Sequence, residues 1–291
     1  MKIQTLSRSA ALPYRRAAAN QKTASLPTMP PIIKELIRFE DELEMERHSL
    51  GFDLGLVMER GSGTRYMPTP PDVIPFAHAG RDGIHYGFLT DFGMTRSLEE
   101  APIVAVAPMS VNSVWLVARS IREFLNVLYS CPELLTRFDG TAESYQLHAI
   151  TEGDPRQERV RERFRERFNI TPVTDPCEYM TRLMEDRRRQ VAVPTLNGLG
   201  VRSLSDTRDI CHTCYTVPEQ IDWQLNGPAV QLFFASATPE AKLAFVRDIQ
   251  SNHLLTDDGL RTFVDGELRT FGFAEVADRL NESYYIPYIE A

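Results

Sequence analysis

The sequence predicts an α+β protein, with a curved antiparallel sheet and flanking helices, followed by a mixed helical and strand-containing C-terminal region. Three observations predict this fold. Short β-rich runs lie between residues 73 and 118, the segments between them are too short for parallel crossovers, and amphipathic stretches precede and follow them. The 291 residues, 43% of them hydrophobic and 25% charged, suit a globular chain of one or two domains.

Four apolar runs are predicted to form the sheet, and turn residues separate the first two. Gly80 and Gly83 accept positive φ, and Asp82 between them can bond its own backbone, so this segment is predicted to turn. In the run after the turn, the large apolar residues Ile84, Tyr86 and Phe88 occupy every second position, and this period predicts a half-buried strand. The predicted strands are Val73–Ala77, Ile84–Leu89, Ile103–Ala107 and Val114–Ala118, with a shorter one near Leu54–Met58.

Helices are predicted on both sides of the sheet in the sequence. Apolar residues recur at helical spacing over residues 31–48. Ser120 with Glu123 matches a capping box, so a second helix is expected to begin there. These elements predict a compact domain over residues 31–140, and the polar segment 139–155 is the predicted boundary.

The C-terminal region, residues 150–291, is predicted to contain helices and one buried strand. Val160, Phe164 and Phe168 form one apolar stripe in a charged helix over residues 154–169. Asp175 followed by proline predicts the start of another helix. That helix is expected to end in the cations Arg187–Arg189, which could instead contact an anionic partner. The further expected elements are a strand at Ala229–Ala235, a helix from Thr238 to Gln250 and a last helix over Phe273–Leu280.

The charge is unevenly distributed. The chain carries a net charge of −8, yet residues 1–30 contain five basic residues and no acidic residue. A disordered basic tail, an organellar transit peptide or a misassigned start each fit this composition. The acidic remainder argues against nucleic-acid binding by the whole chain. No apolar run approaches the roughly 20 residues that span a bilayer, and four cysteines in so long a chain favour a reducing compartment, the cytoplasm.

Two groups of residues could carry chemistry. Cys211 and Cys214 form a CxxC pair, for which ordinary thiols, a zinc site and a redox pair all stay open. A second group, within 14 residues, combines imidazoles and carboxylates: His78, Asp82, His85 and Asp91. These groups could hold a metal or act as a general base, but purely structural roles also stay open, because Asp82 lies in the turn and His85 lies on the strand face opposite Tyr86.

Residues 73–128 resemble a known family. The proline-led run Ile74–Ala77, the Gly/Asp turn and a helix with Ser120, Phe124 and Leu125 are similar to the C-terminal half of a SUKH domain, the superfamily of Smi/Knr-type regulators and many bacterial immunity proteins. Residues 31–70 lack that family's Leu-Pro segment and Asn-Gly turn, and a compact Thr90-Asp91-Phe92-Gly93 follows the central strand. A distinct, SUKH-like family therefore stays open.

The resemblance implies a sheet that binds other proteins and carries no catalysis. We therefore expect a non-enzymatic, intracellular protein-binding module without a cofactor, whose partner could be a nuclease toxin that it neutralises. Arg81, Asp82 and His85 are the expected binding residues. The alternatives are a metal-dependent hydrolase using His78, His85 and Asp91, and a regulatory or structural protein acting through residues 150–291. The sequence does not predict the oligomeric state.

Overall fold

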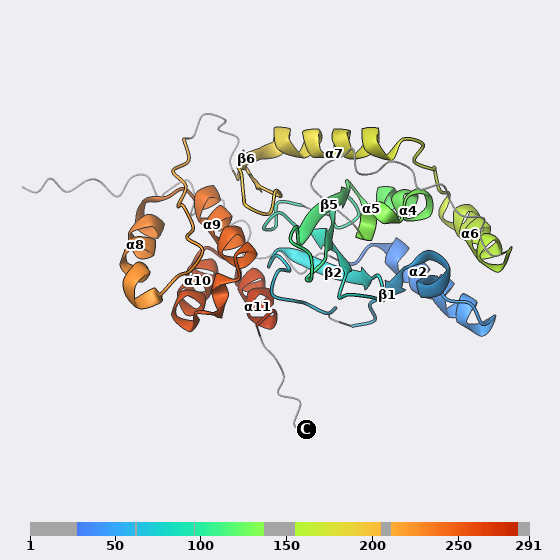
Figure 1. The fold of residues 1–291 in the computed structure, drawn as a ribbon, viewed down its shortest axis with the longest axis horizontal. Coiled ribbons are helices and arrows are strands. Elements are labelled where there is room, and N and C mark those ends of the chain that lie inside the picture. Colours follow the sequence, from blue (N-terminus) through green and yellow to red (C-terminus); the bar gives the residue numbers. More distant parts are fainter. Residues whose placement is uncertain (1–27, 62, 96, 137–154, 205–210, 285–291) are drawn as a thin grey trace, which may run out of the picture.

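The computed structural model confirms the α+β fold. It describes residues 28–61, 63–95, 97–136, 155–204 and 211–284. In these residues a five-stranded antiparallel sheet is followed by a mostly helical half with a small two-stranded sheet. Figure 1 shows the large sheet in the middle, helices α2 and α6 at one end and helices α8 to α11 at the other, with α7 running along one side.

The large sheet has the strand order β1-β2-β3-β4-β5, so each strand pairs with its neighbours in sequence. The four longer strands fall where the sequence predicts them. One prediction about them is wrong: all five residues of β3 are buried, because packed groups cover both of its faces, so the strand is not half-buried. The strands are β1 Val57–Met58, β2 Val73–His78, β3 His85–Leu89, β4 Ile103–Val106 and β5 Val114–Ala118.

The helices around this sheet confirm most of the local signals. Ser120 Oγ accepts a hydrogen bond from Glu123 N at 3.3 Å, whereas the Glu123 carboxylate accepts from Arg119 N, so half of the capping box forms. Leu54 belongs to a short helix, so only the end of the predicted 54–58 strand forms. The helices are α2 Pro31–Met45, α3 Leu50–Leu54, α4 Ile121–Ser130, α5 Glu133–Thr136, α6 Pro155–Phe168 and α7 Pro176–Gln190.

The C-terminal half corrects one element. The predicted strand Ala229–Ala235 is wrong, because these residues lie in helix α8. Val230 and Phe234 are buried while Leu232 is 72% exposed, a helical pattern that the continuous apolar run conceals. The elements are β6 Val191–Val193, β7 Val201–Arg202, α8 Trp223–Ser236, α9 Pro239–Ser251, the 3-10 turn η2 Leu254–Thr256, α10 Asp258–Thr270 and α11 Ala274–Glu282.

The buried apolar side chains of the described residues form two clusters. The first contains the large sheet with helices α2 to α7, including the α6 stripe of Val160, Phe164 and Phe168. The second contains β6, β7 and the helices that follow, and one residue from the sheet region, Phe92. Most of the predicted tail and most of the predicted boundary lie outside the described residues. None of the described helices has the length and apolar character needed to cross a membrane.

Candidate functional site

The two clusters meet at the turn after β3. Asp91 and Phe92 have φ values of 48° and 55°, followed by 83° at Gly93. Left-handed backbone is uncommon outside glycine and stores strain, so the surrounding structure must hold it in place. A hydrogen bond from Gly93 N to Thr90 O, 3.0 Å, closes the turn. This turn carries the Phe92 ring into the second cluster, 6.1 Å from the ring of Phe273.

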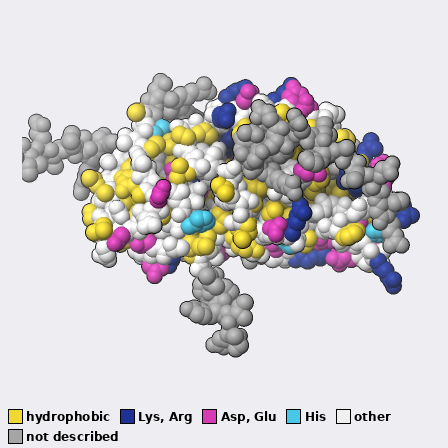
Figure 2. All heavy atoms as spheres, in the orientation of Figure 1, with side chains coloured by type: hydrophobic (Ala, Val, Ile, Leu, Met, Phe, Trp, Pro, Cys, Tyr) yellow, Lys and Arg dark blue, Asp and Glu magenta, His cyan; other side chains and the backbone are white. Residues whose placement is uncertain are grey.

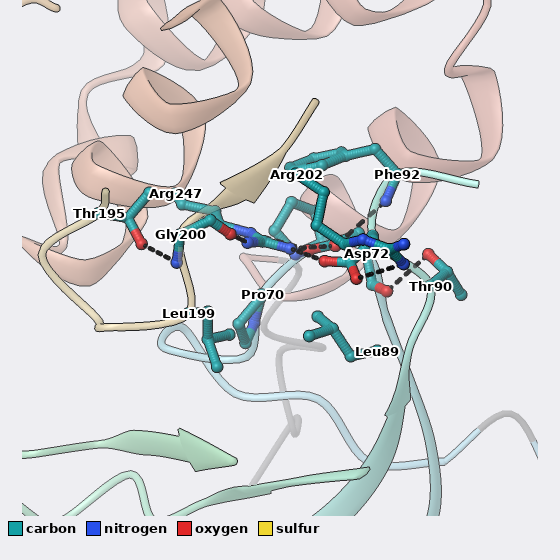
Figure 3. A network of polar contacts seen from close by, with 12 residues as sticks. Pro70, Asp72, Leu89, Thr90, Phe92, Thr195, Leu199, Gly200, Arg202 and Arg247 are labelled. Atoms are coloured by element: carbon teal, nitrogen blue, oxygen red, sulfur yellow. Dashed lines mark hydrogen bonds and ion pairs between the residues drawn. The ribbon is translucent and has the colours of Figure 1, made fainter. Parts of the chain in front are cut away.

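A network of charges surrounds this turn, and we call it the junction cluster: Asp72, Asp91, Arg187 and Arg247, which are buried, and Arg202, which is 33% exposed. Arg187 forms two hydrogen bonds to the Asp91 carboxylate, at 2.7 and 2.6 Å. Arg247 contacts Asp72 at 2.5 Å and Asp91 at 3.4 Å, as Figure 3 shows for Asp72. Arg202 lies 3.7 Å from Asp91. Two carboxylates and three guanidinium groups of the described residues thus lie together, and all but Arg202 are buried.

Backbone groups from several elements complete the junction cluster. Arg187 Nε donates to Leu199 O at 2.7 Å, and Arg247 Nη1 donates to Gly200 O. The guanidinium group of Arg247 also lies over the Phe92 ring, 4.8 Å from its centre. The cluster therefore joins the sheet, α7, the turn between β6 and β7, and α9.

Two members of the junction cluster, Asp91 and Arg247, are held in their ionised forms. Asp72 and Arg247 are completely buried, and the Asp91 side chain is 2% exposed. Burial acts to raise the pKa of Asp91, but hydrogen bonding and charge from Arg187, with the charges of Arg247 and Arg202, hold this pKa below its usual value. For Arg247, burial acts to lower the pKa, yet Asp72 and Asp91 raise it above its usual value. These groups are directed at one another, which suits a structural link between the two clusters.

The two histidines of the sequence analysis face each other, whereas Asp91 lies elsewhere. His78 and His85 are direct partners in the pairing of β2 with β3. Asp91 lies beyond the opposite end of β3, and this strand, about 13 Å long, separates it from the two histidines. His85 contacts Thr69 Oγ1 at 3.0 Å and Gly83 O at 2.9 Å, so both of its ring nitrogens are engaged. Burial lowers the pKa of His85 to about 4, so the ring is neutral at pH 7.

The remaining predicted site residues are distributed over the surface. Arg81 and Asp82 are exposed on the β2–β3 turn, and Asp82 has a φ of 52°, which confirms the turn. Cys211 and Cys214 are exposed and free. In the part of the chain that the structure describes, no three His, Cys, Asp or Glu side chains are grouped so that they could hold a metal ion.

An apolar groove lies on the α7 side of the sheet. Its volume is about 400 Å³, and its walls come from β5, α7 and the turn between β6 and β7. Arg188 lies at this groove, is exposed, and forms no ion pair or hydrogen bond with the described residues. The side chains that give the groove its apolar character are Val114, Trp115, Leu116, Met180, Met184, Val191, Pro194 and Leu199.

Other surfaces are less distinctive. A cavity of about 550 Å³ on the other side of Arg187 contains Arg119, Arg189 and Arg202, but Asp186 and Glu100 line it as well. Helix α8 exposes Leu225 and Leu232 and has no charged residue. On the face in Figure 2, most Lys and Arg side chains lie over the half with α2, α6 and α7.

Comparisons with protein-family models, curated proteins and solved structures found no match to this chain. Arg187 lies in the last turn of α7, as its sequence predicts, and it forms a buried ion pair with Asp91, the metal or base candidate of the sequence. Asp72 and Arg247 were not identified. The compact Thr90–Gly93 segment was the signal that could have directed attention to this junction.

Proposed function

We propose that this chain is a non-enzymatic protein-binding module that accepts an apolar, acid-containing segment of a partner protein in the groove between β5, α7 and the β6–β7 turn. The observation that carries this proposal is the open apolar groove beside a buried charge network whose groups already pair with one another. A groove of about 400 Å³ falls within the usual range of binding pockets.

The walls of the groove suit apolar side chains of a peptide segment. Met184 is half-buried and Met180 is buried, and both belong to α7. Methionine side chains adapt to different partners because they are flexible and polarisable. Each large apolar side chain that a partner buries there would stabilise the complex by about 1.5–3 kcal/mol before the costs of association.

The rim of the groove adds a preference for negative charge. Arg187 is committed to Asp91, but Arg188 has no partner among the described residues. A guanidinium group pairs well with a carboxylate, because two parallel hydrogen bonds can form. The preferred segment therefore carries an aspartate or glutamate beside its large apolar residues.

The class of partner follows from two further observations. The resemblance of residues 73–128 to SUKH domains supports an immunity-type role, in which the partner is a toxin. The net charge of −8 supports a basic partner such as a nuclease, because opposite charges speed association. The four free cysteines support a cytoplasmic location.

The test is photocrosslinking of the full chain in cells of its native host. A photoreactive amino acid replaces Met184 in the groove or, as a control, Met45 of α2, which is 79% exposed. We expect a protein adduct at position 184 that is absent at position 45, and a crosslinked peptide with large apolar residues and a carboxylate. Arg188→Glu should reduce this adduct, whereas the same change at the exposed Arg122 should not. Equal labelling at both positions, or an adduct insensitive to Arg188→Glu, would refute the proposal.

A further inference from the structure

A smaller cavity opens beside the β2–β3 turn, separate from the groove. Its volume is about 340 Å³, and helices α3, α5 and α6 surround it together with the end of β3. Leu128 and Leu135, which are almost completely buried, form an apolar part of its lining. Arg81 and Tyr86 supply polar groups to the same cavity.

Tyr86 is the unusual member of this cavity. The residue is 1% exposed, and its ring lies 5.1 Å from the ring of Phe124. Its hydroxyl forms no hydrogen bond with any described residue and, because Tyr86 lines the cavity, it can donate to a molecule bound there. Burial raises the pKa of Tyr86 well above its usual value, and this outweighs the lowering effect of the Arg81 charge. The hydroxyl is therefore a protonated donor that has no acceptor among the residues that the structure describes.

Two arginines border the same space. Arg81 is exposed and its side chain makes no ion pair or hydrogen bond within the described ranges. Arg161 is fixed, because Nη2 donates to Tyr129 O at 2.6 Å and the guanidinium group lies 4.8 Å from the centre of the Tyr129 ring. Its Nε lies 4.0 Å from Glu158. Arg81 is thus a cation without a partner among the described residues, whereas Arg161 is held by Tyr129.

The acidic residues of the cavity are placed differently. Asp53 Oδ2 accepts a hydrogen bond from Ser49 N at 3.1 Å and lies 3.4 Å from His48 Nδ1, so this oxygen is engaged within the protein. Glu133 is exposed at the rim. The Tyr86 hydroxyl and the Arg81 guanidinium group are thus donors of this lining that have no partner among the described residues.

We propose that this cavity binds a small molecule that carries an oxyanion, a carboxylate or a phosphate. Arg81 and Tyr86 donate hydrogen bonds to the oxyanion, and the lining around Leu128 and Leu135 contacts the apolar part of the ligand. The inference does not depend on the protein-binding groove, because the two sites share no lining residue.

Isothermal titration calorimetry of the full chain tests this proposal with three probes of the same ring size. Benzoate and phenyl phosphate carry the two oxyanions, and benzyl alcohol carries none. We expect at least one anion to bind with a Kd below about 10 mM, with benzyl alcohol at least about tenfold weaker. The anion that binds more tightly identifies the carboxylate or phosphate class.

Three variants separate the site from general charge effects. Tyr86→Phe and Arg81→Gln should each weaken binding of the preferred anion by about tenfold, which is the effect of one hydrogen bond to a charged group. Arg122→Gln, the same change at an exposed arginine outside the cavity, should leave Kd unchanged. Thermal melting checks that Tyr86→Phe folds. Because Arg81 is exposed, Arg81→Gln should fold normally and therefore tests the proposal independently. Absence of anion binding, equal binding of benzyl alcohol, or unchanged Kd in Tyr86→Phe and Arg81→Gln would overturn the proposal.

Discussion

The charge of Asp91 offers the sharpest test of the junction cluster. Asp91→Asn keeps the size of the side chain and removes its charge. In the native structure, this carboxylate accepts two hydrogen bonds from Arg187, lies 3.4 Å from Arg247 and lies 3.7 Å from Arg202. In the variant, Asp72, which pairs with Arg247, is the remaining carboxylate of the cluster.

The expected loss of stability is large because the cluster is buried. Removing one partner of a buried ion pair costs about 3–5 kcal/mol, since the other charge remains desolvated and unpaired. A typical domain has an unfolding free energy of about 5–15 kcal/mol, so the variant should remain folded but close to its limit. Asp265 is the matched control: it accepts two hydrogen bonds from Arg269, both at 2.9 Å, but the Arg269 side chain is 43% exposed. Asp265→Asn should therefore cost much less.

Urea denaturation at pH 7 measures both free energies of unfolding. A second arm uses pH. The folded pKa of Asp91 lies below the usual value of about 3.9, so its contribution is present above that value and is lost as pH falls through the folded pKa. Asp91→Asn should therefore flatten the acid decline of stability. Equal costs for Asp91→Asn and Asp265→Asn, or an unchanged acid decline, would refute the reasoning.

Two further predictions concern single positions. Gly200→Ala should lower the melting temperature, because φ at Gly200 is 59° and an added Cβ would lie 2.4 Å from a methyl group of Val191. The control Gly266→Ala, inside α10, places its Cβ in open space and should stabilise the protein by roughly 0.5–1 kcal/mol. Changes of melting temperature of the same sign in the two variants would contradict this prediction. The pKa of His85 is lowered to about 4 from an unfolded value of about 6.5, so the native protein should lose stability as pH falls from about 6.5 towards 4. His85→Gln should reduce that slope in urea titrations at pH 7 and pH 5, and an identical slope would argue against a buried neutral ring.

The sequence predicted those elements whose signals are local. Asp175 caps α7 as expected, because its side chain accepts from Glu178 N three residues later, at 2.8 Å. The stripe of α6 depends only on the helical period. Residues 229–235 were misassigned because a short apolar run has no period of its own, and the deciding signal was the Asp222 cap before the run.

The junction cluster had no local signal. Arg187 and Asp91 are separated by 96 positions, and Arg247 and Asp72 by 175 positions. No spacing rule relates residues so far apart, and a charged residue is by default expected at the surface. Asp91 was noticed because of nearby histidines, but the strand between His85 and Asp91 carries them apart. The strained turn at Asp91 was visible only as an unusual Thr-Asp-Phe-Gly segment.

Buried charge at the junction requires an explanation, because an apolar contact could be equally stable. Desolvation of two carboxylates and their arginines opposes folding, and well-packed apolar residues often replace buried ion pairs without loss. Paired guanidinium and carboxylate groups require a more exact geometry than apolar contacts do. A small displacement leaves a buried charge unpaired, whereas two apolar surfaces can shift against each other without losing contact. We therefore infer that the junction cluster fixes the orientation of the C-terminal helices relative to the large sheet.

This orientation also determines the walls of the groove. Arg187 lines the groove and pairs with Asp91, while its Nε holds the carbonyl of Leu199, another lining residue. Gly200, at the end of the same turn, accepts from Arg247 in α9. The β6–β7 turn is thus positioned by the two arginines that pair with the carboxylates at the β2 and β3 ends. A change that breaks the cluster without unfolding the chain should therefore alter crosslinking at position 184 before it affects any residue of the β2–β3 turn.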